Sequence, residues 1–420
     1  MTAFDRENLA QITSSAPVWR RPQMEAAYEV FAALEEPTGA EEDWRYVDFD
    51  HSFSELAPVT SAGAALEPGP FVTSLSERSG RILIIDGEVV EHDSDVALVH
   101  RFSDLDSDPG FAGMVPTDHN KLAAAHAAFS PDGARVELKP GTVMEEPLVV
   151  EIHATTEGTA SFPHLQVAVG ENAEASILVD YRSADGARLL VVPRVDLELG
   201  DGGRLRFLSV QGLDHAATTV VHQRAVLGRD STSRIGEVGL GARLARLDLG
   251  VSLVGDGSSS EVVGLYFGEG DQTLDYRMVI DHQGRSTTSD VFLKGAVEDD
   301  AQSVFTGLLR IEKDAARTST FETNRNLVLS ENAKAHSVPN LEILCNDVIC
   351  GHASSVGPLE SDHLYYLMSR GLTRVRAERL LIRGFFQQVI DRLPIQGLGE
   401  PVSDEVFRRF VTAQEEGRVA

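Results

Sequence analysis

Polar turns recur at a nearly constant interval through the middle of the chain. They are built from Gly, Asp and Asn, and four of them begin at Gly170, Gly200, Gly228 and Gly255. The spacing is roughly 27 to 30 residues, and similar turns return less regularly at 298–301 and 330–333. A fixed interval that repeats one supersecondary unit is typical of a solenoid, in which each repeat buries its apolar side against its neighbours.

Short segments with alternating apolar and polar residues lie between these turns. Residues 133–138 and 173–179 are examples, and alternation of this kind indicates strands. Repeats that contain only strands favour a β-helix as the core of a mainly β chain. A large antiparallel sandwich or barrel also offers short strands and Gly turns, and it stays as the alternative fold.

Helical patterns flank the repeats on both sides. Residues 23–34 and 118–129 have helical spacing or composition, with short strands expected between 72 and 99. After Pro358 we expect three helices, with N-caps at Ser361, Thr373 and Ser403. We therefore predict an N-terminal helical and mixed region at 1–130, a β-helix core at 131–355 and a C-terminal helical domain at 356–420.

The composition limits the classes of partner and compartment. The chain of 420 residues has 37 basic and 65 acidic residues, a formal charge of −28, which disfavours nucleic acid and anionic membranes as partners. Its first residues resemble no secretory signal, and no apolar run is long enough to span a membrane. Two cysteines suit a reducing cytoplasm and are too few to hold an iron–sulfur cluster alone.

Several enzyme motifs are missing from the sequence. It has no Gly-Lys-Ser/Thr phosphate loop, no Gly-x-Ser-x-Gly and no His-Glu-x-x-His. We expect His215, His222 and His282 to be surface or structural residues rather than parts of a site. Because β-helices also carry polysaccharide lyases, a carbohydrate-active enzyme stays as the alternative function.

One segment combines metal-ligand types at a meaningful spacing. In Cys350-Gly-His352 a strand would place the thiol and the imidazole on the same face. Such a pair forms half of a site for a soft or borderline metal. The competing interpretation is a cysteine packed as a small apolar residue beside a histidine that is bonded to the backbone.

The residues around this segment extend the pattern. The motifs are Asn324-Arg-Asn326, Ala335-His-Ser-Val-Pro339, Asn346-Asp347, Cys350-Gly-His352-Ala353 and Tyr365-Tyr-Leu-Met-Ser369-Arg-Gly371. Together they resemble the C-terminal signature of the SufB/SufD family of iron–sulfur cluster assembly proteins. The resemblance is closer to SufD members than to SufB members. The small number of cysteines also argues against a SufB-type subunit.

The resemblance implies a fold and a role. It implies a right-handed parallel β-helix with helical flanks, in a non-enzymatic scaffold subunit that works with SufB and the ATPase SufC. A nascent iron–sulfur cluster would be shared with SufB, with His352 as the ligand from this chain and Cys350 as a secondary candidate. A reduced flavin is a further candidate for the complex, and a homodimer is conceivable when SufB is absent. The ATPase-docking helix would include Arg376, Leu380, Phe385, Phe386 and Val389.

Overall fold

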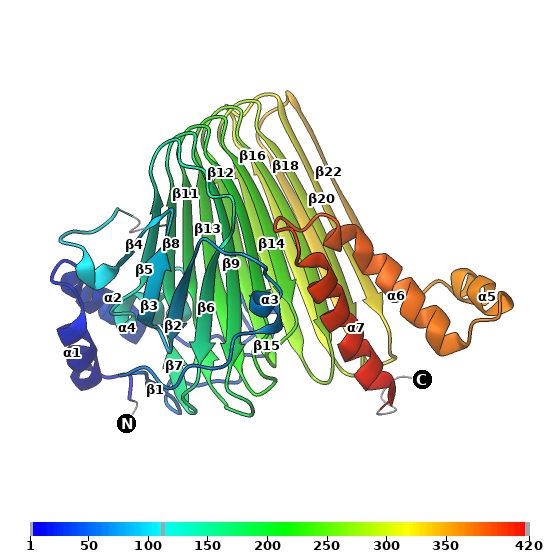
Figure 1. Cartoon of the computed structure of the whole chain (residues 1–420), viewed down its shortest axis with the longest axis horizontal. Coiled ribbons are helices and arrows are strands. Elements are labelled where there is room, and N and C mark those ends of the chain that lie inside the picture. The colour runs from blue at the N-terminus through cyan, green and yellow to red at the C-terminus, as the bar shows by residue number, and fades with distance from the viewer. Residues whose placement is uncertain (1–2, 111–113, 416–420) are drawn as a thin grey trace.

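The computed structural model describes residues 3–110 and 114–415, with side chains as far as residue 410. Residues 1–2, 111–113 and 416–420, which fall within the predicted N- and C-terminal regions, lie outside the described residues. A long stack of strands forms the body of the molecule, with helices gathered at its two ends (Figure 1). In the described part of the chain, no helix is both long and apolar enough to cross a membrane.

The body is a parallel β-helix, as predicted. Successive strands of the body alternate between two sheets, and those away from the two ends pair in parallel with the strands one coil earlier and one coil later. For example, Thr232 of sheet B is the register partner of Ser259, an offset that matches the interval between the polar turns. Interior-facing side chains from both sheets form one continuous apolar core. The antiparallel sandwich or barrel is therefore excluded.

The strands have the following bounds. Sheet A contains β1 (Ala57–Pro58), β4 (Leu98–Arg101), β5 (Ala134–Leu138), β7 (Thr159–Ser161), β8 (His164–Val169), β10 (Leu190–Val191), β11 (Arg194–Leu199), β13 (Thr218–Leu227), β15 (Leu244–Leu253), β17 (Thr273–His282), β19 (Gln302–Ile311) and β21 (Lys334–Ile343). Sheet B contains β2 (Gly80–Ile85), β3 (Glu88–Ser94), β6 (Leu148–Ala154), β9 (Glu174–Ser183), β12 (Arg204–Gln211), β14 (Thr232–Gly239), β16 (Ser259–Gly268), β18 (Thr288–Val297), β20 (Thr318–Val328) and β22 (Val348–Gly357).

Left-handed residues explain the composition of the recurring turns. The third residue of each of the four turns has a positive φ, and these residues are Asn172, Gly202, Asp230 and Gly257. Each donates its backbone N–H to a carbonyl of the next coil, as Asp230 does to Asp256 at 2.9 Å. Gly, Asn and Asp tolerate this conformation best. The turns therefore stack into a ladder that fixes the register of the coils.

The two ends of the β-helix differ. At the N-terminal end, β3 pairs antiparallel with β2 and β4 pairs antiparallel with β5, so the strand direction reverses there, although β3 and β4 are themselves edge strands. Helices α1 (Arg6–Ser15), α2 (Arg21–Ala33) and α4 (Lys121–Phe129) pack on the outer face of sheet A. The remaining N-terminal helices are α3 (Pro70–Thr73), η1 (Glu42–Trp44) and η2 (Phe102–Asp104). At the C-terminal end, β21 and β22 each pair with one strand only among the described residues.

Three helices follow β22: α5 (Ser361–Ser369), α6 (Arg374–Ile390) and α7 (Gly399–Glu415). Thr373 caps α6 as predicted, and Gly371, just after α5, has a positive φ of 92°. Two cap predictions were wrong. Glu360, rather than Ser361, is the N-cap of α5. Ser403 lies inside α7, because a proline in the first turn needs no hydrogen-bond partner and the helix begins at Gly399, before Pro401.

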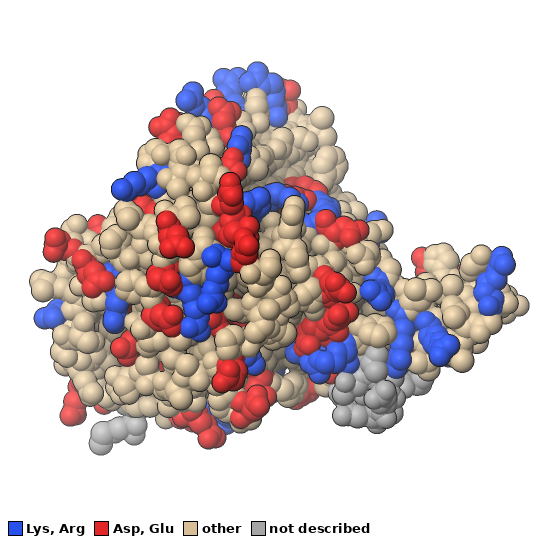
Figure 2. Space-filling view, in the orientation of Figure 1, with Lys and Arg blue, Asp and Glu red and all other residues tan. Residues whose placement is uncertain are grey.

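Helices α6 and α7 cover part of sheet B, whereas α5 projects away from the body (Figure 1). Acidic and basic side chains are interspersed over most of the face in Figure 2. The projecting C-terminal helices carry several basic side chains on that face. Helix α6 contains Arg374, Arg376, Arg379 and Arg383, so this part of an acidic chain is locally basic.

Candidate functional site

Cys350 and His352 lie on β22, the last strand of sheet B. The register pairs Cys350 with Thr320 and His352 with Glu322, and both partners on β20 are buried. Because pairs of register partners point to the same face, the thiol and the imidazole face the interior side of the coil. Ser354, two residues beyond His352, donates a hydrogen bond of 2.8 Å to Ser337 on the facing sheet. The site is therefore the mouth of the β-helix.

The side chains at this mouth remain accessible. His352 is exposed and Cys350 is half-buried, since no further coil covers them among the described residues. Cys345 lies in the turn between Ile343, the end of β21, and Val348, the start of β22. The strand is thus broken between the two cysteines, and both are free thiols.

Glu322 adds a carboxylate beneath His352. Its side chain is buried, and burial raises its pKa to about 7. Its Oε2 atom has no hydrogen-bond partner among the described residues. Gly307 on the facing sheet leaves room for it, because a Cβ atom at Gly307 would collide with the Glu322 carboxylate. The mouth therefore combines a thiol, an imidazole and an acid that is easily protonated.

Sequence reasoning missed Glu322, although a signal existed. Glu322 precedes His352 by one repeat, roughly 30 residues, so it occupies the same position one coil earlier. Within the described residues, no group of three His, Cys, Asp or Glu ligand atoms lying within 4.8 Å of one another includes Cys350 or His352. By itself this chain offers a partial ligand set at the mouth.

An apolar rim surrounds the free strand edges. Its exposed side chains are Phe321, Leu341, Ile343, Leu344, Ile349 and Val356. Ile349 is 64% exposed, which is high for an isoleucine within a strand. Unpaired strand edges bordered by apolar side chains are suited to pairing with another chain.

The predicted docking residues on α6 divide into two groups. Arg376 and Leu380 are exposed, and Leu380 is 50% exposed. Phe386 and Val389 are buried against sheet B, and Phe385 is half-buried at its margin. The ammonium group of Lys294 lies below the helix and donates to the carbonyl of Phe385 at 2.7 Å. The apolar stripe therefore anchors the helix, and the opposite side faces solvent.

Helix α5 contains no buried residue. Tyr365 is 76% exposed, and Tyr366 and Met368 are exposed beside it. Helix α5 has little to pack against because it extends away from the β-helix (Figure 1). Exposed aromatic and methionine side chains are typical of protein-binding surfaces.

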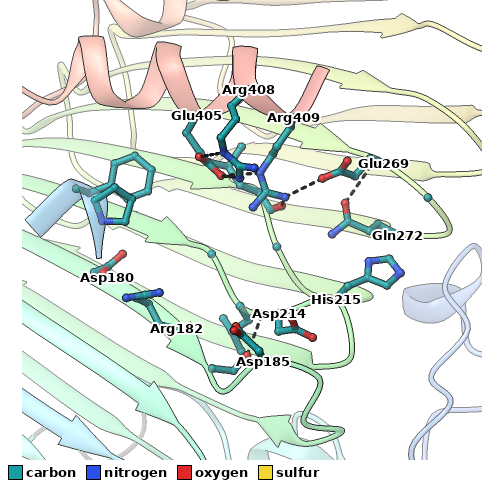
Figure 3. Close-up of a pocket in the computed structure, with 18 residues that line it drawn as sticks. Asp180, Arg182, Asp185, Asp214, His215, Glu269, Gln272, Glu405, Arg408 and Arg409 are labelled. Atoms are coloured by element: carbon teal, nitrogen blue, oxygen red, sulfur yellow. Dashed lines mark hydrogen bonds and ion pairs between the residues drawn. The ribbon is translucent and has the colours of Figure 1, made fainter. Parts of the chain in front are cut away.

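A polar cavity of about 570 Å³ lies where α7 meets the ends of sheet B strands (Figure 3). Burial raises the pKa of Asp180 to about 7. On the opposite wall, Glu405 accepts from Arg408 at 2.6 Å and from Arg409 at 2.9 Å. Arg409 also pairs with Glu269 at 3.1 Å. Glu405 holds the two arginines within α7, and Arg409 joins the helix to the β-helix through Glu269. No sequence motif predicted this cavity.

The comparisons with known proteins bear on this arrangement. Residues 152–385, more than half of the chain, match the family described as SUF system FeS cluster assembly, SufBD core domain. The chain belongs to the SufB/SufD family. Two proteins named SufD are among its relatives, which supports the SufD-like interpretation of the sequence.

The matched regions span most of the length of each relative. An iron–sulfur cluster assembly SufBD family protein of Mycobacterium tuberculosis is 31% identical over 379 residues, which is 88% of each chain. SufD of Bacillus subtilis is 31% identical over 300 residues, 70% of this chain and 68% of the relative. SufD of Escherichia coli is 23% identical over 406 residues, 93% of each chain. A role in iron–sulfur cluster assembly follows from this membership.

Proposed function

We propose that this chain is the non-ATPase scaffold subunit of a cytoplasmic complex with a SufB-like subunit and a SufC-like ATPase. The observation that carries the proposal is the open mouth of the β-helix, where His352 and Cys350 stand above Glu322 beside unpaired strand edges. We favour this scaffold over a carbohydrate-active enzyme because the relatives described above are named for cluster assembly.

At the mouth, the nascent cluster is cargo held between two chains. His352 supplies an imidazole ligand from this chain, and Cys350 is the secondary candidate. The ligands missing from this side come from cysteines of the SufB-like partner, because iron–sulfur clusters are held mainly by thiolates. The exposed edges of β21 and β22 give that partner a template for strand pairing. A second copy of this chain would use the same edges when the partner is absent.

The ATPase binds the exposed side of the C-terminal helices. Arg376 and Leu380 on α6 make the contact, together with Tyr365 and Tyr366 on α5. Phe386 and Val389 transmit the position of α6 to sheet B, because they are packed against its strands. ATP binding and hydrolysis by the partner can therefore move a helix that is coupled to the β-helix.

Co-expression with both partners tests the proposal. We expect a tagged chain to recover the SufB-like subunit and the ATPase, and the complex to assemble a cluster under anaerobic conditions with iron and a sulfur donor. Adding reduced flavin in a parallel reaction tests whether the complex uses it. A chain that stays alone and recovers neither partner would contradict the scaffold function.

A further inference from the structure

Three potential metal ligands meet on the outer face of sheet A, far from the mouth of the β-helix. His222 on β13 and Asp248 on β15 are register partners on neighbouring strands, and both side chains are buried. His119 comes from the segment just before α4, which packs over this face. One ligand atom from each of His119, His222 and Asp248 lies within 4.8 Å of the other two.

The hydrogen bonds orient these side chains toward a common point. His119 Nε2 lies 2.6 Å from Asp248 Oδ2. Asn120 Oδ1 accepts from the backbone N–H of Ala123, so the amide nitrogen of Asn120 faces His222 Nε2 at 3.3 Å. An amide nitrogen can only donate, so His222 Nε2 is unprotonated and accepts from Asn120, and a metal ion bound at this atom would take the place of that hydrogen bond.

The surroundings hold the carboxylate in place. Arg224 lies beside Asp248, with Nη2 at 3.2 Å from Oδ1, and it donates from Nη1 to the Asp248 carbonyl at 2.7 Å. This leaves Oδ2 to His119, with a ligand atom of His222 within 4.8 Å of both residues. Groups that orient a ligand in this way are typical of protein metal sites. His119 is partly exposed, so an ion can reach the cluster from solvent.

We propose that His119, His222 and Asp248 bind a divalent first-row transition metal ion such as Fe(II) or Zn(II). Two imidazoles and one carboxylate are suitable ligands for both ions and leave positions open for water. On binding, the metal takes the place of the proton between His119 and Asp248, and that proton goes to solvent. His119 must move outward slightly, which its exposed position allows.

The bound ion would join two parts of the chain that are distant in sequence. His119 belongs to the N-terminal region, whereas His222 and Asp248 belong to the β-helix. Binding therefore stabilises the packing of α4 against sheet A and raises the thermal midpoint, by an amount that grows with the logarithm of the metal concentration divided by Kd. This site is separate from His352, so the inference stands independently of the function proposed for the mouth.

Metal binding to the purified full-length chain tests the inference. The chain is stripped with a chelator and titrated under anaerobic conditions with Zn(II), Fe(II) and Co(II). Calorimetry gives affinity and stoichiometry, and the visible spectrum of Co(II) reports its coordination. We expect one equivalent bound in this site, a nitrogen- and oxygen-type Co(II) spectrum and a higher thermal midpoint. Comparing Fe(II) with Zn(II) identifies the preferred ion.

Variants assign the binding to these residues. We expect His119→Ala and His222→Gln to weaken this binding at least tenfold, as loss of one ligand commonly does. His215→Ala is the matched control, because His215 also lies 2.6 Å from a carboxylate, that of Asp271, but on an exposed surface. His352→Ala separates this site from the mouth. Unchanged affinity in a folded His119→Ala variant, or equal loss in His215→Ala, would overturn the proposal. His119 is partly exposed, so its variant remains informative even when His222→Gln fails to fold.

Discussion

His352 on β22 and Glu322 on β20 are register partners on the interior side of the last two strands of sheet B. The imidazole is exposed at the mouth, whereas the carboxylate is buried and its pKa is raised to about 7. A protonated acid can donate a hydrogen bond to an imidazole or a sulfur atom, and an ionised acid can ligate iron. In the function proposed above, the pair would serve two states of a cluster under assembly.

Replacing His352 with Ala should abolish or strongly reduce cluster assembly by the reconstituted complex, because the imidazole ligand is lost. We expect partner recovery to stay unchanged, since the exposed side chain contributes little to stability. Anaerobic absorption spectra of the complex measure the assembled cluster. His215→Ala, at an exposed position of the β-helix, is the control. Equal assembly by the His352 and His215 variants would show that His352 is not a ligand.

Charge reversal on the exposed side of α6 should weaken ATPase binding. We expect Arg376→Glu combined with Leu380→Asp to reduce affinity at least tenfold, because both side chains face solvent where the partner is proposed to bind. The thermal midpoint should change little. Arg285→Glu, at an exposed turn of the β-helix, is the control for altered net charge. Calorimetric titration with the ATPase measures the difference in affinity. Equal affinity for both variants would show that the ATPase does not bind at Arg376 and Leu380.

The buried carboxyl group of Glu237 should make stability depend on pH. Burial raises its pKa from 4.5 to about 7, although Ser209 and Gln223 donate hydrogen bonds to it. Between these values the folded chain keeps a proton that the unfolded chain loses. The free energy of unfolding therefore falls as pH rises through this window, by up to about 3 kcal/mol.

Glu237→Gln should remove this dependence, because the amide cannot ionise and fills the same space. We expect the variant to gain stability relative to the parent between pH 5 and pH 8, measured by urea unfolding at both values. Glu198→Gln, on an exposed position of the same β-helix, provides the comparison. A Glu237 variant whose difference from the parent is the same at both pH values would contradict the assignment.

The turn ladder can be tested at Gly257. Its φ of 73° disfavours any side chain, and a Cβ atom there would also collide with Asp230 of the preceding coil. We expect Gly257→Ala to lower the free energy of unfolding by more than the roughly 1–2 kcal/mol that the backbone conformation alone costs. Gly186→Ala is the matched control, because its φ is 69° but nothing lies within 4 Å of the added atom. Similar losses in the two variants would show that the contact with Asp230 is unimportant.

The sequence predicted the β-helix because its turns carry a backbone requirement. Each of these turns needs a left-handed residue, and Asn172 and Asp230 belong to the few residue types that tolerate this conformation. The strand periodicity of two also predicted correctly that Cys350 and His352 share a face. Backbone preferences of turn residues and the two-residue period of strands depend only on neighbouring residues, so they can be recognised in the sequence without knowing the fold.

Features that depend on register or on distant segments could not be predicted. In the sequence, the charged Glu322 next to the apolar Phe321 suggests that Glu322 faces solvent. In the structure the order is reversed: Glu322 is buried on the interior side of β20, and Phe321 is exposed. His222 was expected to be an ordinary histidine, because its neighbours His119 and Asp248 come from other parts of the chain. His282 was expected to be structural, and its bonds to Thr287 and Ser289 agree with that expectation.

The antiparallel strands β3 and β4 at one end of the coil have a consequence for the size of assemblies. A β-helix with two open ends would add copies head to tail and grow into a fibre, because each new copy would offer a fresh edge. Here the strand direction reverses at one end, where β3 and β4 run antiparallel to their neighbours, whereas β21 and β22 at the other end keep the parallel direction. A head-to-tail stack of copies would therefore break the parallel pattern at every junction, so identical copies cannot continue one uninterrupted parallel β-helix.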